Sequence, residues 1–476
     1  MRPSTPDVNR WLKPAAIAAW LAASVAWLRA DGLLRDGDEE GHVGAAELFR
    51  ADLLRGDIAG FAERLWVGPM GEYPQMFAAM VGGWWWLTGI GDPAHPWVRS
   101  ICLISLPVTA LATGRIAARL HGGERAAGVD AWVTLMVLTV PLANGLTRHF
   151  MPEGLLMAVT ALAILCALRW ADYPSLNRSI QLGAVLGVGL MTKQTFILAA
   201  ALPVAWIVRE RLTSRPGMLA TVAAVATAIA GPWLAANLGP QLAYAGASVA
   251  GHGSSAGPDH LAFYPRSVLW VGLGPFLTAA AVWAFVRVQR APGFTVAAIW
   301  LLGGLVVLMV IPKKYPRLMV PLLPAAVLMM AGVWRPGGRV WAGVASAAAA
   351  WTVWLSVDGV AIHRRSPGVD PGCPQEWIRP PGDSDVGLSL AADALAELGP
   401  GDVRVVADPA IPCAVQTTHD WSNHLGPLLR RRGQDRAVHR DAEKPHRFVL
   451  EWGDRGQGTE VPELNQSFTI RDRLSP

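Results

Sequence analysis

Apolar runs of about membrane-spanning length recur through residues 1–357, and they constrain the fold of this chain more than any other feature. A helix needs about 20 mostly apolar residues to cross the hydrocarbon core of a bilayer. Only 16% of the residues are charged, against about 25% in soluble globular proteins. The sequence therefore predicts an all-α polytopic membrane protein. Its expected spans are 11–30, 97–119, 128–146, 154–169, 180–192, 195–209, 217–236, 266–287, 293–311, 316–334 and 340–357.

The arginines between these runs predict which side of the membrane each loop faces. One further apolar run, 73–90, carries a Gly-Gly-Trp-Trp-Trp cluster. Tryptophan rings favour the membrane–water interface, so we expect this run to lie along the membrane. With the N-terminus inside, the arginine-rich short loops then all fall on the inner side, as the positive-inside rule requires. We therefore expect eleven spans, with the first outer loop (31–96), the Gly-, Ser- and His-rich loop at 238–265 and the tail from 358 all outside.

The polar tail at 358–476 predicts a small C-terminal α/β extracytoplasmic domain that follows the membrane domain at 1–357. Residues 388–398 have the pattern of an amphipathic helix that Gly-Pro-Gly ends. Residues 403–407 and 448–452 have the composition of short strands. A unit of this size is large enough to have its own core.

The four cysteines and the first apolar run bear on the compartment. Cys102 and Cys166 lie in apolar runs and are most simply small core residues. Cys373 and Cys413 lie in the tail and could form a disulfide if the tail is extracytoplasmic, although the sequence does not show that they meet. The first apolar run lacks a small-x-small cleavage site, so we expect it to be a retained anchor.

Carboxylates gather in the first outer loop, directly after the first apolar run. Asp38, Glu39 and Glu40 stand together and are followed by His42. Charged groups beside a membrane segment are costly unless they meet water, a cation or a substrate. One interpretation is a catalytic acidic edge at the outer face of the bilayer. The alternative is a solvated loop or a helix N-terminus, where carboxylates favour the macrodipole.

Cations also gather on the predicted outer side, against the positive-inside pattern. Lys313, Lys314 and Arg317 stand at the outer ends of two spans, and phosphate is the natural partner of such a group. A carboxylate that deprotonates a hydroxyl and cations that stabilise a departing phosphate together suit transfer from a lipid phosphate. The alternatives are headgroup anchors that snorkel and, for Arg148 with Glu153, a structural ion pair.

Six short motifs follow one another along residues 31–330. They are Asp38-Glu39 in the first outer loop, Tyr73-Pro74 at the start of the interfacial run, Arg99 at the start of the next span, Thr147-Arg148 with Glu153-Gly154-Leu155-Leu156, Gly189-Leu190-Met191-Thr192-Lys193, and Tyr315-Pro316-Arg317 before a Leu-Leu-Pro helix. In this order they resemble the GT-C superfamily of polytopic glycosyltransferases, especially the branch of protein O-mannosyltransferases and the lipid A aminoarabinose transferase. Gln75 stands where that branch has a second proline, Glu153 stands where aspartate is usual, and the Lys193 element is shortened.

The resemblance implies inverting transfer of a sugar from a polyprenyl-phosphate donor to an extracytoplasmic acceptor hydroxyl of a glycan, a lipid or a protein. Asp38 would be the general base, and Glu39 would position the acceptor or a cation. Arg148, Lys193 and Arg317 would hold the lipid phosphate. The full set of substrate-binding residues implied in this way is Glu40, His42, Tyr73, Arg99, Arg148, Glu153, Lys193, Lys314, Tyr315 and Arg317.

Other functions stay open at this point. Asp38, Glu39, His42 and Glu153 suit a divalent metal, but no short ligand motif accompanies them, so no cofactor is assigned. The rival from another class is a transporter or flippase of a lipid-linked or anionic solute, and a third alternative is an inactive protein that only binds polyprenyl lipid. Transporters place charges near the bilayer midplane between repeated halves, whereas here they gather at one face and no repeat is visible. We expect a multi-pass protein of the plasma (inner) membrane that has no nucleic-acid partner.

Overall fold

The computed structural model describes most of residues 8–363 and five strands of the tail. Between 8 and 363, the stretches 32–36, 69–72, 93–94, 124–125, 252–257, 288–292, 311–314 and 335–338 lie outside the described residues. Beyond 363, the described residues are Leu395, Glu397 and the ranges 403–407, 438–439, 448–454, 459–461 and 466–472.

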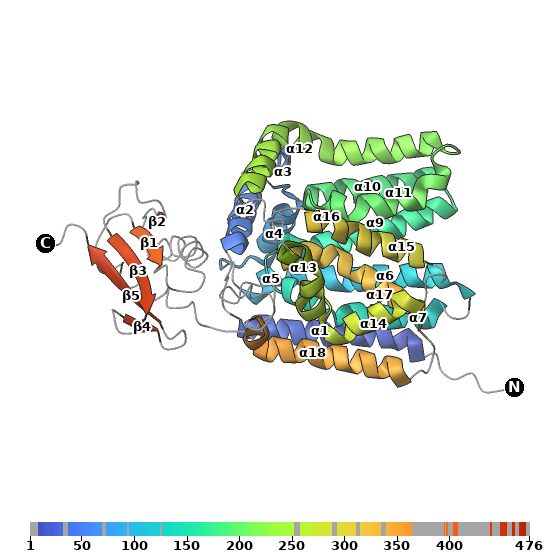
Figure 1. Cartoon of the computed structure of the whole chain (residues 1–476). Helices are drawn as coiled ribbons and strands as arrows, with labels where there is room; N and C mark the ends of the chain where they lie inside the picture. Colours follow the sequence, from blue (N-terminus) through green and yellow to red (C-terminus); the bar gives the residue numbers. More distant parts are fainter. Residues whose placement is uncertain are drawn as a thin grey trace.

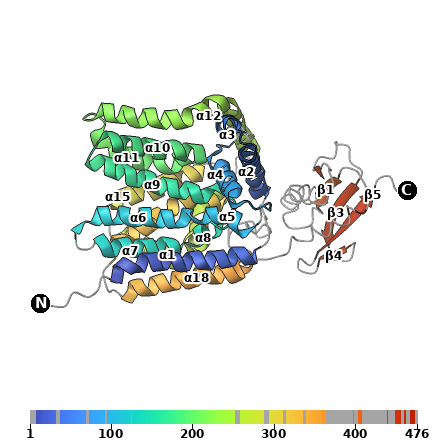
Figure 2. The same cartoon turned by 180° about the vertical axis from the view of Figure 1, so that it is seen from behind.

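Helices make up the chain as far as residue 363. Figures 1 and 2 show α6, α9, α10 and α11 lying side by side, with α2 and α3 standing across one end of them. The α-helices are α1 (Val8–Ala30), α2 (Gly37–Leu54), α3 (Ile58–Val67), α4 (Met76–Thr88), α5 (Pro96–Leu103), α6 (Ser105–His121), α7 (Ala126–Leu138), α8 (Pro141–Leu146), α9 (Pro152–Asp172), α10 (Leu176–Thr192), α11 (Phe196–Val208), α12 (Pro216–Gly251), α13 (Pro258–Ser267), α14 (Gly274–Arg287), α15 (Phe294–Ala298), α16 (Gly304–Val310), α17 (Leu323–Ala331) and α18 (Arg339–His363). The 3-10 segments are η2 (Arg209–Arg211) and η5 (Pro316–Leu322), and the π-helical segments are η3 (Val268–Gly272) and η4 (Ile299–Gly303).

Four of the described helical stretches are long and apolar enough to cross a membrane, judged by length and composition: Trp11–Ala30, Pro96–His121, Pro152–Asp172 and Pro216–Ala243. Shorter apolar helical stretches lie at Ala126–Leu138, Gly274–Arg287, Phe294–Val310, Pro316–Ala331 and Val340–Ser356. The mostly helical membrane protein expected from the sequence is thus confirmed. The number of eleven spans stays a prediction.

Helix α9 lies at the centre of the helical part and carries the first residues of the candidate site. It packs against α6, α10, α11 and η5, and 72% of its most apolar window is buried inside the protein. Its N-terminal turn begins at Pro152, whose fixed φ suits the first position of a helix and whose missing N–H would have no partner there. Central packing therefore fixes the place of Glu153, the next residue.

The run at 73–90 forms α4, a helix of 13 residues that packs against α2. At 1.5 Å per residue it is about 20 Å long, which is less than the hydrocarbon thickness of about 30 Å. The two helices approach closely because residue 82 is glycine: a Cβ there would lie 2.4 Å from the carbonyl oxygen of Ala46. The position of α4 along the membrane surface stays a prediction.

Helix α12 corrects the expected end of one span. The sequence predicted a span at 217–236 and then an outer loop at 238–265, whereas α12 continues to Gly251 and α13 begins at Pro258. Pro240 lies inside the helix without ending it, since a proline removes only one backbone hydrogen bond. The extended helix reaches α3, where the side-chain amide of Asn237 donates to the carbonyl of Trp66 at 3.2 Å.

The tail contains a five-stranded sheet with strand order β2-β1-β3-β5-β4, drawn in orange and red in Figure 1. Its strands are β1 (Val403–Ala407), β2 (Val438–His439), β3 (Phe448–Asp454), β4 (Thr459–Val461) and β5 (Gln466–Asp472). Strand β1 pairs in parallel with β2 and β3, and β5 pairs antiparallel with β3 and β4. Both strands expected from the sequence are therefore present. Of the expected helix at 388–398 the structure describes only Leu395 and Glu397, both helical, and Cys373 and Cys413 lie outside the described residues.

Candidate active site

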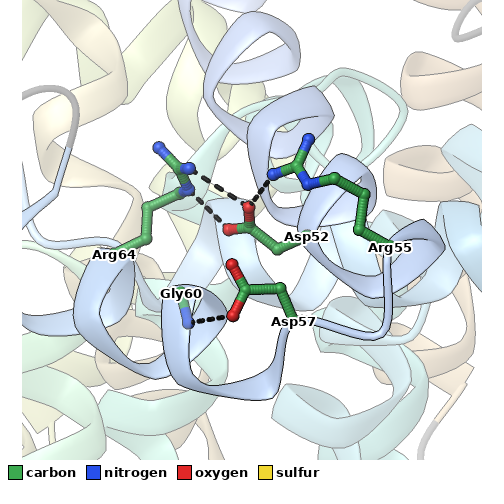
Figure 3. A network of polar contacts seen from close by, with 5 residues as sticks. All are labelled: Asp52, Arg55, Asp57, Gly60 and Arg64. Carbon is green, nitrogen blue, oxygen red and sulfur yellow. Dashed lines mark hydrogen bonds and ion pairs between the residues drawn. The ribbon is translucent and has the colours of Figure 1, made fainter.

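The elbow between α2 and α3 fixes the direction of the helix that carries the acidic stretch (Figure 3). Asp52 is 1% exposed and accepts hydrogen bonds from Arg64 at 2.7 and 3.2 Å and from Arg55 at 2.5 Å. Asp57 is the N-cap of α3, and its carboxylate accepts from the backbone N–H of Gly60 at 2.8 Å. Charge-assisted bonds of this kind are the strong ones, so the elbow holds α2 and α3 at one angle.

The first turn of α2 carries residues 38 to 40, and its Glu39 reaches the loop between α8 and α9. We call residues 147–151 the α8–α9 loop. The Glu39 side chain is fully buried, and its Oε1 accepts the backbone N–H of Phe150 at 2.7 Å and lies 3.2 Å from His149 Nδ1. An ionised carboxylate in such a place is stabilised by the donors it meets. Glu39 therefore ties α2 to the α8–α9 loop.

Arg99 makes the second tie to the same loop. It is fully buried in α5, where its guanidinium donates to the backbone carbonyl of Arg148 at 2.9 Å. The same side chain donates to the Asp31 carbonyl and pairs with the Asp31 carboxylate, both at 2.9 Å. Asp31 stands just past α1 and is also fully buried. Arg99 thus joins α1, α5 and the α8–α9 loop through one ion pair and two backbone carbonyls, and this use of its donors is structural.

Arg148 is a buried cation of a different kind. It is 8% exposed, its guanidinium lies 5.2 Å from the ring centre of Trp27, and it donates to the hydroxyl of Ser356 in α18 at 3.2 Å. Among the described residues no carboxylate pairs with it, and its Nε is buried without a hydrogen-bond acceptor. Burial lowers the pKa of Arg148 to about 10. An anion placed here would raise the pKa of Arg148 again, because a nearby negative charge favours the charged guanidinium.

Glu153 gathers the remaining cations at the start of α9. Its fully buried carboxylate receives the ammonium of Lys193, the C-cap residue of α10, at 2.5 Å. Arg317 of η5 lies on the same oxygen, with Nε 3.6 Å away, and His42 of α2 also acts on Glu153 electrostatically. The second oxygen, Oε2, is buried and accepts no hydrogen bond from the described residues. Four separate elements thus meet at one carboxylate.

Aromatic rings flank this cluster. The guanidinium of Arg317 lies 4.9 Å from the ring centre of Tyr315, and His42 packs edge-on against Tyr73 at 6.0 Å and Phe77 at 5.5 Å. Cations over aromatic faces and edge-on ring pairs are both favourable arrangements. Tyr73 and Tyr315, which the sequence selected, therefore stand beside His42 and Arg317.

The structure brings together most of the residues selected from the sequence. Glu39, His42, Tyr73, Arg99, Arg148, Glu153, Lys193, Tyr315 and Arg317 lie on or around the α8–α9 loop and the start of α9, through the contacts given above. The side chains of Asp38 and Glu40, and the whole of Lys314, lie outside the described residues. The alternative of an ion pair between Arg148 and Glu153 is not seen, since Glu153 pairs with Lys193.

The sequence missed Asp31, Trp27 and Ser356. Asp31 had a usable signal, because a carboxylate that directly follows an apolar run needs a cation nearby. Trp27 looked like one more interfacial tryptophan. Ser356 gave no signal, since it lies 208 residues from its partner Arg148.

Two of the residues considered for a metal, Glu39 and Glu153, already have protein partners. Glu39 holds Phe150 and His149, and Glu153 holds Lys193. No group of three or more His, Cys, Asp or Glu that could hold a metal ion occurs in the described part of the chain. These carboxylates fit a metal poorly, so we derive no step through one.

Comparison with known proteins finds similarity to glycosyltransferases. Residues 85–235 match the family model described as dolichyl-phosphate-mannose-protein mannosyltransferase. No curated protein matches the chain in sequence. Structurally, ArnT from Cupriavidus metallidurans bound to undecaprenyl phosphate aligns with a TM-score of 0.59 at 18% identity, over 94% of this chain and 94% of that chain. The apo state of the same protein gives 0.57 at 18% identity over 92% of each chain.

A more distant structure shares the fold. AglB, an archaeal oligosaccharyltransferase from Archaeoglobus fulgidus solved with an inhibitory peptide and a dolichol-phosphate, aligns with a TM-score of 0.55 at 9% identity. The alignment covers 94% of this chain and 70% of that chain. The family model and these folds confirm the predicted resemblance to the GT-C superfamily.

Proposed function

We propose that this membrane protein is a glycosyltransferase that takes a sugar from a polyprenyl-phosphate donor and transfers it to an acceptor hydroxyl of a glycan, a lipid or a protein at the extracytoplasmic face. The observation that carries the proposal is Arg148, a buried cation with no carboxylate partner among the described residues. It follows Thr147 at the end of α8, five residues before Glu153 with its own two cations. A site that holds buried cations and leaves one without an anion suits a phosphate. Structural relatives solved with undecaprenyl phosphate and dolichol-phosphate support the same class of lipid.

Arg148, Lys193 and Arg317 would hold the phosphate of the donor lipid. In the ground state Glu153 keeps Lys193 and Arg317 in place. As the bond between the anomeric carbon and the phosphate oxygen breaks, negative charge grows on that oxygen. Cations that are already fixed stabilise this charge without reorganising, and for this reason they lower the barrier.

The acceptor hydroxyl would attack the anomeric carbon from the face opposite the phosphate, which inverts the configuration there. The new bond joins the acceptor oxygen to the sugar, the bond to the phosphate oxygen breaks, and polyprenyl phosphate leaves. Asp38, in the first turn of α2 one turn before His42, would take the hydroxyl proton. Glu39 would be a positioning residue, because its bond to the Phe150 N–H fixes that turn against the α8–α9 loop.

The test is sugar transfer by the purified full-length protein from a panel of radiolabelled polyprenyl-phosphate sugars. The parent is compared with Asp38→Asn and with Glu47→Gln, an exposed carboxylate on the same helix. We expect the parent and Glu47→Gln to transfer or hydrolyse one donor, and Asp38→Asn to lose a factor of about 10² to 10⁴ in rate. Binding of the lipid by all three proteins with turnover of no donor would overturn the proposal in favour of transport or lipid binding.

A further inference from the structure

A second group of charges lies at the other end of α9, away from the candidate active site. We call Arg119, Arg169, Arg178, Arg209 and Arg211 the arginine cluster. A helix of 21 residues is about 30 Å long, so about one hydrocarbon thickness separates this cluster from Glu153. Arg119, Arg169 and Arg178 belong to α6, α9 and α10, and Arg209 and Arg211 form η2 directly after α11. Figure 2 shows these four α-helices side by side.

One member of the cluster, Arg211, lines a hollow in the protein surface. The hollow has a volume of about 490 Å³ and is lined by Ala171, Asp172, Tyr173, Ile207, Glu210 and Arg211. This volume falls in the range of about 300 to 1,000 Å³ that small-molecule sites occupy. None of these lining residues takes part in the proposed transfer reaction.

The carboxylates at the hollow are already paired with members of the cluster. Asp172 makes an ion pair with Arg119, and Glu210 pairs with Arg209 at 3.0 Å. Each of the two acids is therefore neutralised by one arginine. Arg169, Arg178 and Arg211 remain without such an acid among the described residues, and the charge of Arg169 acts on its neighbour Arg119. The acids thus do not cancel the positive charge of the cluster.

Backbone carbonyls fix the two arginines that matter most. Arg178 donates through one nitrogen to the carbonyls of Arg169 at 2.7 Å and Tyr173 at 3.3 Å, and Arg211 donates through Nε to the carbonyl of Ala171 at 3.1 Å. These acceptors lie at the C-terminal end of α9, whose last carbonyls and negative dipole end attract cations. Among the described residues no carboxylate pairs with either arginine. Because a guanidinium has five N–H donors, both have donors left for an anion.

Exposed apolar side chains surround the cluster and indicate where the anion comes from. Tyr173 (71% exposed) and Trp206 (38%) contact Arg178 and Arg209, and Leu176 (58%) and Leu212 (51%) lie within two residues of Arg178 and Arg211. A free phosphate ion would gain nothing from such neighbours, whereas the acyl chains of a lipid would cover them. Tyrosine and tryptophan beside arginine are also typical of the membrane–water interface.

We propose that the arginine cluster and its hollow bind the phosphate of an anionic phospholipid headgroup, in the leaflet opposite the candidate active site. Arg178 and Arg211 hold the phosphate, and the exposed apolar side chains contact the acyl chains. Such a lipid would anchor the ends of α9, α10 and α11 to one another. This site does not depend on the proposed transfer reaction, since it shares no residue with it.

The test is a lipid titration of the full-length protein in detergent, read by native mass spectrometry. Phosphatidylglycerol is compared with phosphatidylcholine of the same acyl chains and with inorganic phosphate. The variant is Arg178→Gln/Arg211→Gln, and the matched control is Arg115→Gln/Arg215→Gln, which removes the same charge from exposed positions at the same end of these helices. An arginine near an anionic lipid headgroup contributes about fivefold to affinity, so we expect the variant to bind phosphatidylglycerol about 30-fold more weakly and the control to lose much less.

A second variant, which is expected to bind phosphatidylglycerol more tightly, keeps the test valid if the double variant fails to fold. Glu210→Gln removes one carboxylate from the hollow and leaves every arginine in place, so we expect it to bind phosphatidylglycerol more tightly than the parent. Equal binding of phosphatidylglycerol and phosphatidylcholine by the parent would overturn the proposal, as would weaker binding by Glu210→Gln. Inorganic phosphate that competes as well as the lipid would show a free-phosphate site and overturn the assignment to a lipid.

Discussion

The pair between Lys193 and Glu153 allows the structural and the catalytic use of Lys193 to be separated. Lys193→Met leaves the Glu153 carboxylate buried, and breaking a buried ion pair from one side typically costs about 3–5 kcal/mol in stability. Because Arg317 remains 3.6 Å from the same oxygen, we expect the cost to lie near ~3 kcal/mol. Glu153→Gln leaves two cations without their carboxylate, so we expect a cost near ~5 kcal/mol.

The double variant Glu153→Gln/Lys193→Met removes both charges and should recover part of this stability, because no uncompensated carboxylate remains. Donor binding should not recover with it. If Lys193 contacts the donor phosphate, the double variant has lost one charge-assisted hydrogen bond to the ligand. Such a bond contributes about 1.5–3 kcal/mol, which corresponds to a roughly 10- to 150-fold weaker affinity for polyprenyl phosphate.

The assay measures thermal unfolding in detergent and the Kd for polyprenyl phosphate on the parent, the two single variants, the double variant and one control. Arg29→Met serves as the control, since it removes an exposed cation from the C-terminal end of α1. Parent-like affinity in the double variant would refute the contact between Lys193 and the phosphate. Parent-like stability of both single variants would refute the reasoning about the buried pair itself.

Two further predictions concern the elements that hold α2 in place. Gly82→Ala should destabilise the protein by about 1–3 kcal/mol, because the new Cβ would lie 2.4 Å from the Ala46 carbonyl oxygen. Gly83→Ala is the control and should be tolerated, since a Cβ there would meet nothing within 4 Å. Equal unfolding midpoints of the two variants would contradict this prediction. A hydrogen bond from Arg64 holds the pKa of Asp52 below its ordinary value of 3.8, so the stability from this pair is present above that value and is lost as pH falls through the lowered pKa. The unfolding midpoint of the parent should therefore fall more steeply on acidification than that of Asp52→Asn, and parallel curves would remove the role of Asp52 in the elbow.

The sequence predicted the parts of this fold that depend on local patterns and missed those that depend on contacts between distant residues. Span-length apolar runs are local signals, and the helices occur where those runs lie. The predicted end of the span at 236 was wrong because a Gly-, Ser- and His-rich composition indicated a loop from 238, whereas α12 continues to Gly251 and contacts α3 through Asn237 and Trp66. Helix propensity is a weak guide to where a helix ends when tertiary contacts satisfy the backbone hydrogen-bonding groups.

The candidate site shows the same division between local and long-range information. Residue types on one predicted side of the membrane were enough to select Glu153, Lys193 and Arg317, and they do meet. Which cation Glu153 would pair with was not predictable, since an ion pair with Arg148 was one of the alternatives left open, whereas Glu153 pairs with Lys193 and Arg317. The structure instead places Arg148 against Trp27, which in the sequence looked like one more interfacial tryptophan.

The α8–α9 loop explains why so many charged residues can be buried at one end of this helical protein. Backbone groups of the loop provide one partner each for Glu39, through the Phe150 N–H, and for Arg99, through the Arg148 carbonyl, beside the side-chain partners His149 and Asp31. These bonds hold α2 and α5 on either side of the loop, and the Arg148 side chain is left to face Trp27 and α18. A buried cation held in this way has already lost its rotamer freedom on folding. An anion that binds it therefore does not have to offset that loss of side-chain entropy. The fixed backbone of this loop is therefore what makes a phosphate site at this position physically reasonable.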